Sequence, residues 1–425
     1  MTTGTLALII LGAVVLQVAG AILVGLYRRR RDFHQISSEG GEVPPDSLVP
    51  NPASTANHDG PPAWEGYKAF VVRQRHIEDT NGSICSFYLV PEDGAPLPTF
   101  QPGQYLTFKL GVEDPQTHES RTVVRCYSLS DQPNPAYYRV SVKRVLPPAG
   151  QPELPPGLSS NFLHDEVREG SRLMVKKPSG HFYLADDKPL PVVLIAGGIG
   201  ITPMLSILNT LMGKGSTREI YLFYGVRNGR ELIMTEHLRS LAETHSNFHL
   251  HLCFSAPLNE EVENVDYHHK GRVDIPLLRA TLKLMRHQFY VCGPAPMMES
   301  IVPGLEDWSV HKNDIYYESF GPATLVRKDE TKLASATVST EPISVTFSQS
   351  GKQVAWSKES NSLLEFAETQ GIDIDSGCRA GSCGSCQTRL TAGEVEYSQQ
   401  PDADVDDGYC LLCISKPKGN LTLVA

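Results

Sequence analysis

Five of the nine cysteines of this 425-residue chain lie within its last fifty residues. Three of them fall in one short glycine-rich segment, Cys378-Arg-Ala-Gly-Ser-Cys383-Gly-Ser-Cys386, which has the spacing C-x4-C-x2-C. A compact loop with this spacing can wrap three thiolates around one metal centre, and its glycines allow the backbone to approach that centre closely. The spacing therefore predicts a C-terminal module that folds around bound metal.

A [2Fe–2S] cluster is the centre that this spacing favours. The fourth ligand is expected from downstream, where Cys410 and Cys413 both qualify by distance. We favour Cys413, because the segment GYCLLC at 408–413 resembles the segment that carries the last ligand in plant-type ferredoxins, and we interpret Cys410 as a core residue. Zinc is the alternative, but structural zinc usually takes two C-x2-C-like pairs. The predicted ligands are Cys378, Cys383, Cys386 and Cys413.

The first thirty residues predict a membrane anchor. Residues 5–27 are uncharged and almost wholly apolar, and at about 1.5 Å per residue they could span a bilayer. No charge precedes this run and Arg28, Arg29, Arg30 and Arg31 follow it, which is the reverse of a cleaved signal peptide. The positive-inside rule then predicts a single-pass protein of the inner or plasma membrane with its remaining residues in the cytoplasm. A buried core helix is the alternative.

Changes of composition and periodicity predict a multidomain chain. Short β-type runs separated by turn residues indicate a small antiparallel barrel, and the strand–turn–helix units after it indicate an α/β domain with a parallel sheet. The last part suits a small α+β unit. The predicted parts are an anchor with a basic stop at 1–31, a flexible tether at 32–62, the barrel at 63–186, the α/β domain at 187–322, a linker at 323–341 and the α+β unit at 342–425.

Two motifs of the barrel region point to a flavin. The segment RCYSLS at 125–130 resembles the R-x-Y-S motif of the ferredoxin–NADP reductase superfamily. A guanidinium can bind a flavin phosphate, a tyrosine ring can pack on the flavin, and a serine hydroxyl can reach flavin N5. The segment GLSSNFL at 157–163 fits G-x-x-S-x-x-L, in which a helix N-terminus holds a pyrophosphate. The predicted flavin residues are Arg125, Tyr127, Ser128, Leu129, Ser130, Val142, Lys143, Gly157, Ser159 and Ser160.

The α/β region carries the signs of a nucleotide site. The segment AGGIGITP at 196–203 follows an apolar strand and opens a helix, so its backbone can approach a pyrophosphate. The segments VCGPAPMM at 291–298 and YESFG at 317–321 resemble those that flank the nicotinamide and the flavin in the same superfamily. Cys292 and Phe320 have core packing as their alternative interpretation. The predicted nucleotide residues are Gly197, Gly198, Gly200, Thr202, Pro203, Arg227, Cys292, Gly293, Pro294, Met297 and Phe320.

The choice of nucleotide stays open. Arg227 follows a predicted strand and could meet the 2′-phosphate of NADPH, but no acidic residue is clearly placed against it. The pyrophosphate-type motif favours FAD, and FMN is less favoured, although phthalate dioxygenase reductase uses FMN in the same fold.

The resemblance extends over residues 64–425 and implies an enzyme. The flavin and nucleotide parts resemble the reductase half of flavohaemoglobins, and the domain order resembles phthalate dioxygenase reductase and hybrid-cluster protein reductase, both without the anchor. It implies hydride transfer from NADH or NADPH to the flavin and single-electron transfer through the [2Fe–2S] cluster to a separate acceptor. Ser128, Cys292 and Glu318 are the implied catalytic residues. An NAD(P)H:quinone reductase and a redox sensor without turnover are the alternatives.

The expected partners are the lipid bilayer and a protein redox acceptor, such as an oxygenase component at the membrane. A net charge of −10 argues against nucleic acid. An acidic run at Asp402, Asp404, Asp406 and Asp407 could dock a basic acceptor, with a solvated loop as the default interpretation. A solvated loop is also predicted around His268 and His269.

Overall fold

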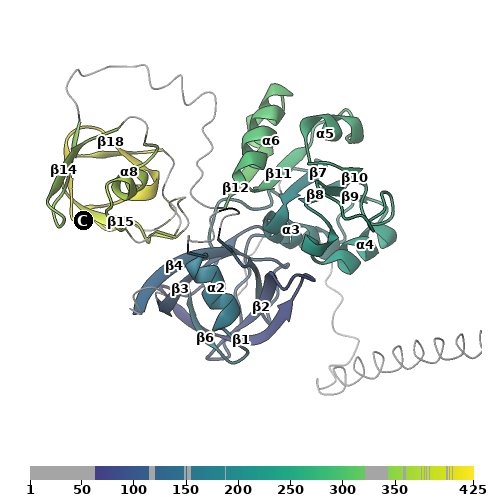
Figure 1. Ribbon diagram of the computed structural model, residues 1–425, viewed down its shortest axis with the longest axis horizontal. Helices are drawn as coiled ribbons and strands as arrows, with labels where there is room; N and C mark the ends of the chain where they lie inside the picture. The colour runs from purple at the N-terminus through teal and green to yellow at the C-terminus, as the bar shows by residue number, and fades with distance from the viewer. Residues whose placement is uncertain are drawn as a thin grey trace, which may run out of the picture. The chain divides into compact units, whose positions relative to one another are not determined.

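The computed structural model describes residues 63–113, 120–147, 150, 155–186, 188–320, 343–357, 360–374 and, after 375, all but seven positions: 378, 380, 382, 399, 400, 402 and 404 (Figure 1). The predicted anchor, tether and linker lie outside these residues, as do Cys378, Asp402 and Asp404. In this part of the chain no helix has both the length and the apolar character that a bilayer crossing requires.

Residues 63–186 form a six-stranded antiparallel barrel that is nearly closed. Its strands are in the order β4-β3-β6-β1-β2-β5, and a bridge between Leu129 and Val140 joins the two outer strands. Alternating side chains of these strands fill one interior that includes Phe70, Phe87 and Phe108, all nearly inaccessible to solvent. The strands are β1 (Lys68–Ile77), β2 (Ile84–Pro91), β3 (Tyr105–Glu113), β4 (Ser120–Ser128), β5 (Tyr138–Lys143) and β6 (Arg172–Val175).

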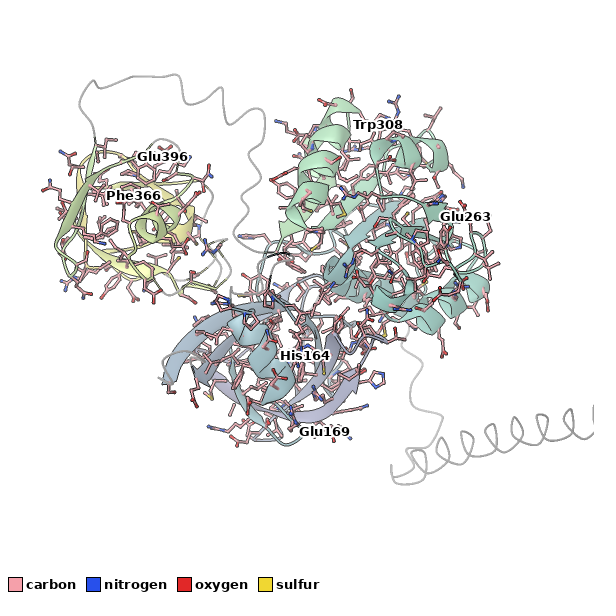
Figure 2. The ribbon with its side chains drawn as sticks, in the orientation of Figure 1. His164, Glu169, Glu263, Trp308, Phe366 and Glu396 are labelled. Carbon is pink, nitrogen blue, oxygen red and sulfur yellow. The ribbon has the colours of Figure 1, made fainter. Side chains whose placement is uncertain are left out.

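Helix α2 (Leu158–Asp165) covers one end of this barrel. It packs through Leu163, and His164 is almost fully buried with its Nε2 2.9 Å from the carbonyl oxygen of Val142 (Figure 2). Burial lowers the pKa of His164, so the ring is neutral near pH 7 and is part of the packing.

Residues 188–320 form a six-stranded parallel sheet in the order β10-β9-β8-β7-β11-β12. Its central strands are buried along nearly their whole length and are mostly apolar, as expected for a sheet that is covered on both faces. The strands are β7 (Val192–Gly197), β8 (Ile220–Val226), β9 (Phe248–Phe254), β10 (His269–Lys270), β11 (Gln288–Gly293) and β12 (Ile315–Ser319).

Two hydrophobic cores lie on the two faces of this sheet. Val192 and Leu194 point to α3 (Ile201–Gly213) and α4 (Thr235–Thr244), whereas Val193 and Ile195 point to α5 (Ile275–Thr281) and α6 (Ala295–Asp307). Figure 1 shows the two helix pairs on opposite faces of the sheet. The 3-10 turns η1 (Gly198–Gly200), η2 (Gly229–Glu231) and η3 (Lys312–Asp314) connect these elements.

The C-terminal module is α+β. Its five-stranded sheet has the order β14-β13-β19-β15-β17, and β16 pairs separately with β18. Phe366 of α8 packs against Trp356 at a ring-centroid distance of 5.0 Å (Figure 2). The elements are β13 (Ser344–Phe347), β14 (Lys352–Ala355), α8 (Leu363–Thr369), β15 (Gln387–Ala392), β16 (Val395–Tyr397), β17 (Tyr409–Leu411), η4 (Leu412–Ile414), β18 (Ser415–Pro417) and β19 (Leu421–Leu423).

Candidate functional site

The three predicted catalytic residues come together where the barrel meets the parallel sheet. Ser128 is the last residue of β4, and its Oγ donates a hydrogen bond of 3.3 Å to Oε2 of Glu318 on β12. Cys292 on β11 is the direct parallel-sheet partner of Glu318. A hydroxyl, a carboxylate and a thiol from three strands therefore meet at one domain boundary, although they are far apart in the sequence.

Cys292 is suited to shaping this site and not to acid–base chemistry. Its side chain is fully buried, and burial, reinforced by the negative charge of Glu318, raises the pKa of the Cys292 thiol well above its usual value. The thiol is therefore neutral at pH 7 and presents a small, weakly polar surface. The polar groups of this cluster are the Ser128 hydroxyl and the Glu318 carboxylate.

The predicted flavin residues divide into exposed and interior groups. Arg125 is exposed on β4, and the half-buried Tyr127 ring stands edge-on to Phe108 with centroids 5.6 Å apart. Burial raises the pKa of Tyr127, so its phenol stays protonated. Leu129 and Val142 belong to the barrel core.

Ser130 faces a polar network inside the barrel. Its Oγ lies 2.8 Å from Oγ of Ser141, which in turn lies 2.6 Å from Oγ of Ser86. The Nε of the buried Arg139 also donates to Ser130 Oγ over 3.2 Å. The hydroxyl of Ser130 therefore acts within the barrel, where it fixes the start of the turn that follows β4.

The two serines at the start of α2 differ in their contacts. Ser160 Oγ is engaged by the backbone, since it lies 3.1 Å from the Gly157 carbonyl oxygen and 3.2 Å from the Val145 amide. Ser159 Oγ is buried and has no hydrogen-bond partner within the described residues. No side chain caps this helix end. An unpartnered hydroxyl beside an uncapped helix N-terminus fits a flavin pyrophosphate.

The glycine-rich turn after β7 is packed tightly against the end of β11. A Cβ on Gly200 would lie 2.2 Å from the carbonyl oxygen of Cys292, and one on Gly197 would lie 2.7 Å from Cδ of Pro294. A Cβ on Gly293 would clash with Met297 at 2.4 Å. Gly200 therefore has to be glycine, because it meets backbone atoms, whereas at Gly293 the end of the Met297 side chain could move aside.

The same turn leaves one side open. Gly198 has φ +53° and a Cβ there would meet nothing within 4 Å. Helix α3 begins at the end of the turn with no side-chain cap. The Thr202 hydroxyl instead donates a hydrogen bond of 3.0 Å to the Ile199 carbonyl oxygen. An uncapped helix of thirteen residues with an open glycine at its start fits a dinucleotide pyrophosphate.

The other predicted nucleotide residues surround this turn. Pro203 is buried in the first turn of α3, and Pro294 is exposed immediately before α6. Met297 is half-buried and packs against the core that lies under α5 and α6. Phe320 is 38% exposed, so it is not core packing.

Three of the described cysteines of the C-terminal module, Cys386, Cys410 and Cys413, belong to its core cluster. Cys383 and Cys386 are buried, and the backbone N–H of Cys413 donates to Sγ of Cys386 over 3.4 Å. Cys410 lies on β17 in the module core, where burial raises its pKa to about 12. Within the described residues, which exclude Cys378, no group of three or more His, Cys, Asp or Glu has the arrangement of a metal site.

Comparison with known proteins identifies the modules. Residues 194–302 match the oxidoreductase NAD-binding domain, and residues 345–418 match the 2Fe-2S iron-sulfur cluster binding domain. A flavohemoprotein of Halalkalibacterium halodurans is 40% identical over 263 residues, which are 62% of each chain. The flavohem-like FAD/NAD-binding domain of nitric oxide dioxygenase from Vibrio cholerae O1 biovar El Tor is 31% identical, with 60% of this chain and 99% of that chain covered and a TM-score of 0.51.

The chain belongs to the ferredoxin–NADP reductase superfamily. A longer match within this superfamily is the structure of phthalate dioxygenase reductase, which is 26% identical, with 85% of this chain and 98% of that chain covered and a TM-score of 0.50. That structure is described as modular, for electron transfer from pyridine nucleotides to [2Fe–2S]. This chain spans 62% of the length of the H. halodurans flavohemoprotein.

These matches confirm the predicted cofactors of this superfamily member, which are FAD, NADH or NADPH, and a [2Fe–2S] cluster. The buried Ser159 hydroxyl, the uncapped helix ends and the open Gly198 fit the phosphates of the two nucleotides. Cys386 and Cys413, which are in contact through the Cys413 backbone N–H, fit part of a thiolate ligand set.

One buried charged contact near the nucleotide domain was not predicted from the sequence. Glu231 is almost fully buried in η2 and holds Arg227, whose Nε lies 2.5 Å from Glu231 Oε1 and whose second nitrogen contacts the same oxygen. Lys143 approaches the other oxygen at 3.8 Å. The available signal was the spacing, because an acidic residue four positions after an arginine can reach it on a helical turn.

The prediction of a solvated loop at His268 and His269 is wrong. His269 is part of strand β10, and its Nε2 lies 3.1 Å from Nδ1 of His251. His268 Nδ1 accepts a hydrogen bond of 2.9 Å from the Leu252 amide. The local sequence is polar, but the pairing of β10 with β9 places the two rings against the sheet edge.

Proposed function

We propose that this chain is an NAD(P)H-dependent reductase that passes electrons from the nucleotide through FAD and its own [2Fe–2S] cluster to a separate acceptor. The observation that carries the proposal is that 85% of the chain aligns with 98% of phthalate dioxygenase reductase, whose structure is described as modular, for electron transfer from pyridine nucleotides to [2Fe–2S]. FAD, when bound, supplies the conversion between a two-electron hydride and single electrons.

The chain's own residues position the reactants. Ser128 and Glu318 hold a hydroxyl–carboxylate pair at the domain boundary, where the hydroxyl can face the flavin and the carboxylate can take up a proton. Gly200 and Gly293 allow the two turns to close around the nucleotide, and Cys292 excludes water behind them. Cys413 is the proposed fourth cluster ligand, because it approaches Cys386 while Cys410 lies in the core.

The domain boundaries that we propose follow these modules. They are 63–186 for the FAD-binding barrel, 187–322 for the nucleotide domain and 342–425 for the ferredoxin domain, with a linker at 323–341. Residues 1–31 are proposed as a single-pass anchor in the inner or plasma membrane, with 32–62 as a tether. An anchored reductase gains most from an acceptor that is confined to the same surface, because tethering raises the effective concentration.

The decisive experiment is an anaerobic titration of the full chain with NADH and, separately, with NADPH. Flavin absorbance and the EPR signal of the reduced cluster are followed together. We expect the flavin to bleach and a rhombic [2Fe–2S] signal to appear with at least one nucleotide. If neither nucleotide reduces the protein, the reductase proposal fails and a carrier or redox sensor replaces it.

The anchor and the acceptor class need separate tests. The full chain should sediment with membranes and remain there in high salt, whereas a variant lacking residues 1–31 should be released. The acceptor class is tested by comparing turnover with a soluble ubiquinone analogue and with one-electron protein acceptors. Faster turnover with the ubiquinone analogue would favour the alternative function, an NAD(P)H:quinone reductase.

A further inference from the structure

A short segment of the barrel is joined to the nucleotide domain at both of its ends. Ser128, the last residue of β4, donates to Glu318 on β12 over 3.3 Å. Three residues later, Asp131 Oδ1 accepts a hydrogen bond of 2.8 Å from Nδ2 of Asn209 on α3. Segment 128–131 therefore contacts two elements of the parallel-sheet domain, and only the first contact involves the reactive pair.

The carboxylate of Asp131 is held firmly on the barrel side. Its Oδ2 accepts a hydrogen bond of 3.1 Å from the Tyr137 hydroxyl and lies 3.4 Å from Nη1 of Arg139. Only 8% of the Arg139 side chain and 14% of the Asp131 side chain are exposed, so solvent and salt screen this ion pair little. Burial and the negative charge of Asp131 raise the pKa of Tyr137 to about 12, so the phenol keeps the proton that it donates. One carboxylate oxygen is thus fixed by the barrel, and the other is presented to α3.

Asn209 is oriented by a second contact, within the nucleotide domain. Nε2 of His237 on α4 lies 2.8 Å from Asn209 Oδ1. Since this amide oxygen can only accept, the His237 ring donates to it and the amide nitrogen faces Asp131. The turn after β4 also approaches the end of α3, because a side chain at Gly213 would clash with the amide oxygen of Gln132. Two separate contacts thus bring this turn against α3.

Helix α3 connects the Asp131 contact to the nucleotide turn. The helix begins directly after the glycine-rich turn that fits the pyrophosphate, and Asn209 lies about 13 Å along the helix axis from Gly200. Ten of the thirteen residues of α3 are buried, so close packing makes the helix move as a rigid unit. A bond at Asn209 therefore fixes where the turn lies relative to Ser128.

We propose that Asp131 is a positioning residue that, through Asn209, holds the nucleotide turn at the distance from the Ser128 segment that hydride transfer requires. The inference rests on the proposed function and adds a residue to it. Asp131 acts through α3 and takes no part in the transfer itself. Because the pyrophosphate turn belongs to the nucleotide domain alone, loss of the bond should slow the reaction without weakening nucleotide binding.

The test exchanges the two partners of the bond. Asn209→Asp alone places two carboxylates side by side and should separate segment 128–131 from α3. Adding Asp131→Asn should restore the contact, because an amide again faces a carboxylate and His237 can donate to the new carboxylate. Arg139 loses its charged partner in this double variant, so its stability should stay low while the rate recovers. A residue with only a structural role would show no such recovery.

The rate is measured by anaerobic stopped-flow reduction of the FAD-loaded full chain over a range of concentrations of the nucleotide that reduces the wild type. The limiting rate of Asn209→Asp should fall by at least about tenfold, because misplacement of the reactants by about 1 Å can cost about a hundredfold. The concentration for half-maximal rate should change by less than about threefold. The long-wavelength charge-transfer absorbance of nicotinamide stacked on flavin should weaken in this variant and return in the double variant.

The matched control is Asp186→Asn, which removes another carboxylate that contacts α3. Asp186 Oδ2 accepts a hydrogen bond of 2.9 Å from Lys214 at the end of the helix, but both side chains are more than half exposed. Exposed ion pairs contribute little, so the limiting rate should stay within about twofold of the wild type. If Asn209→Asp does not fold, Asn209→Ala decides the question, because alanine keeps the helix and the limiting rate should still fall by about threefold or more.

Hydrogen exchange separates this inference from the proposed function, because it needs no hydride transfer. In the FAD-loaded full chain, amides of residues 128–137 and 205–213 should exchange faster in Asn209→Asp, and the wild-type pattern should return in the double variant. Unchanged exchange, or faster exchange with an unchanged limiting rate and charge-transfer absorbance, would overturn the positioning role. A wild type that neither nucleotide reduces would refute the proposed function instead, whatever the exchange pattern.

Discussion

At the scale of single residues, the hydrogen bond between Ser128 and Glu318 can be tested directly by mutation. Both Ser128→Ala and Glu318→Gln should slow flavin reduction by about tenfold or more at the proposed hydride-transfer site. Ser128→Ala removes the donor of this hydrogen bond, and Glu318→Gln removes the charge of its acceptor. Anaerobic stopped-flow absorbance measures the rate. Since the two side chains share one bond, the double variant should lose less than the product of the single losses.

The control for the Glu318 variant is Glu299→Gln, which alters an exposed carboxylate on α6 of the same domain. Its rate should equal that of the wild type. A Ser128→Ala protein with unchanged rate and unchanged nucleotide affinity would show that the pair only joins the two domains.

The choice between Cys410 and Cys413 as a cluster ligand is also decided by single residues. Cys413→Ala should abolish the cluster's visible absorbance and EPR signal, because it removes the proposed fourth thiolate ligand, whose backbone N–H lies 3.4 Å from Cys386 Sγ. Cys410→Ala should keep both signals and lose only packing in the core. Iron content and EPR of the reduced proteins provide the measurement, and the reverse outcome would assign Cys410 as the ligand.

At the scale of elements, the meeting of the β7 turn with β11 depends on Gly200. Gly200→Ala would place a Cβ 2.2 Å from a backbone oxygen that has little freedom to move, so the free energy of unfolding of the nucleotide domain should fall by about 1–3 kcal/mol. Gly111→Ala on β3 is the matched control, because a Cβ there meets nothing within 4 Å.

Tryptophan placement makes this measurement specific. The chain has three tryptophans, and Trp64, Trp308 and Trp356 lie one in each module. In a Trp64→Phe/Trp356→Phe background, urea unfolding followed by fluorescence reports the nucleotide domain through Trp308. Equal midpoints for the Gly200 and Gly111 variants would contradict the close packing of the turn.

The pairing of β9 with β10 makes the stability of the nucleotide domain depend on pH. Burial, with smaller contributions from His269, His268 and His249, lowers the pKa of His251 from 6.5 to about 4. The unfolded chain therefore binds a proton that the folded chain excludes, so stability is complete above pH 6.5 and falls as the pH decreases towards 4. Between pH 7 and pH 5 the nucleotide domain should lose about 2 kcal/mol of unfolding free energy through this group.

His251→Gln should remove most of that loss, although the variant starts from a lower stability because the ring stacks on Phe223 at 4.6 Å. His311→Gln, at an exposed position, should keep the wild-type slope. Urea titrations at pH 7, 6 and 5 give the slopes, and parallel curves for the His251 variant and the wild type would exclude this source of pH dependence.

At the scale of the whole molecule, the C-terminal module has its own hydrophobic core, so it can be removed by truncation. The C-terminal core contains residues from 345 onwards only. A chain that ends at residue 320 should therefore keep NAD(P)H oxidation with ferricyanide, while it loses the EPR signal and the transfer to one-electron protein acceptors. Loss of ferricyanide activity together with intact FAD content would indicate that the ferredoxin domain completes the nucleotide site.

Motifs in the sequence predicted most of this organisation. The C-x4-C-x2-C spacing, the glycine-rich turn and the R-x-Y-S segment are local patterns, because cluster and phosphate binding require particular residue types at short fixed distances. The barrel, the parallel sheet and the α+β module were predicted from strand periodicity for the same reason, since burial on one or both faces repeats along a single segment.

Contacts between distant segments were decided only by the tertiary structure. The Ser128–Glu318 bond joins residues 190 positions apart, the burial of Ser130 in a polar network depends on β2 and β5, and the His251–His269 pair depends on strand pairing. The ion pair of Arg227 with Glu231 forms because the 3-10 turn η2 brings the two side chains together. Local sequence determined which groups can do chemistry, and the packing of strands determined which of those groups meet.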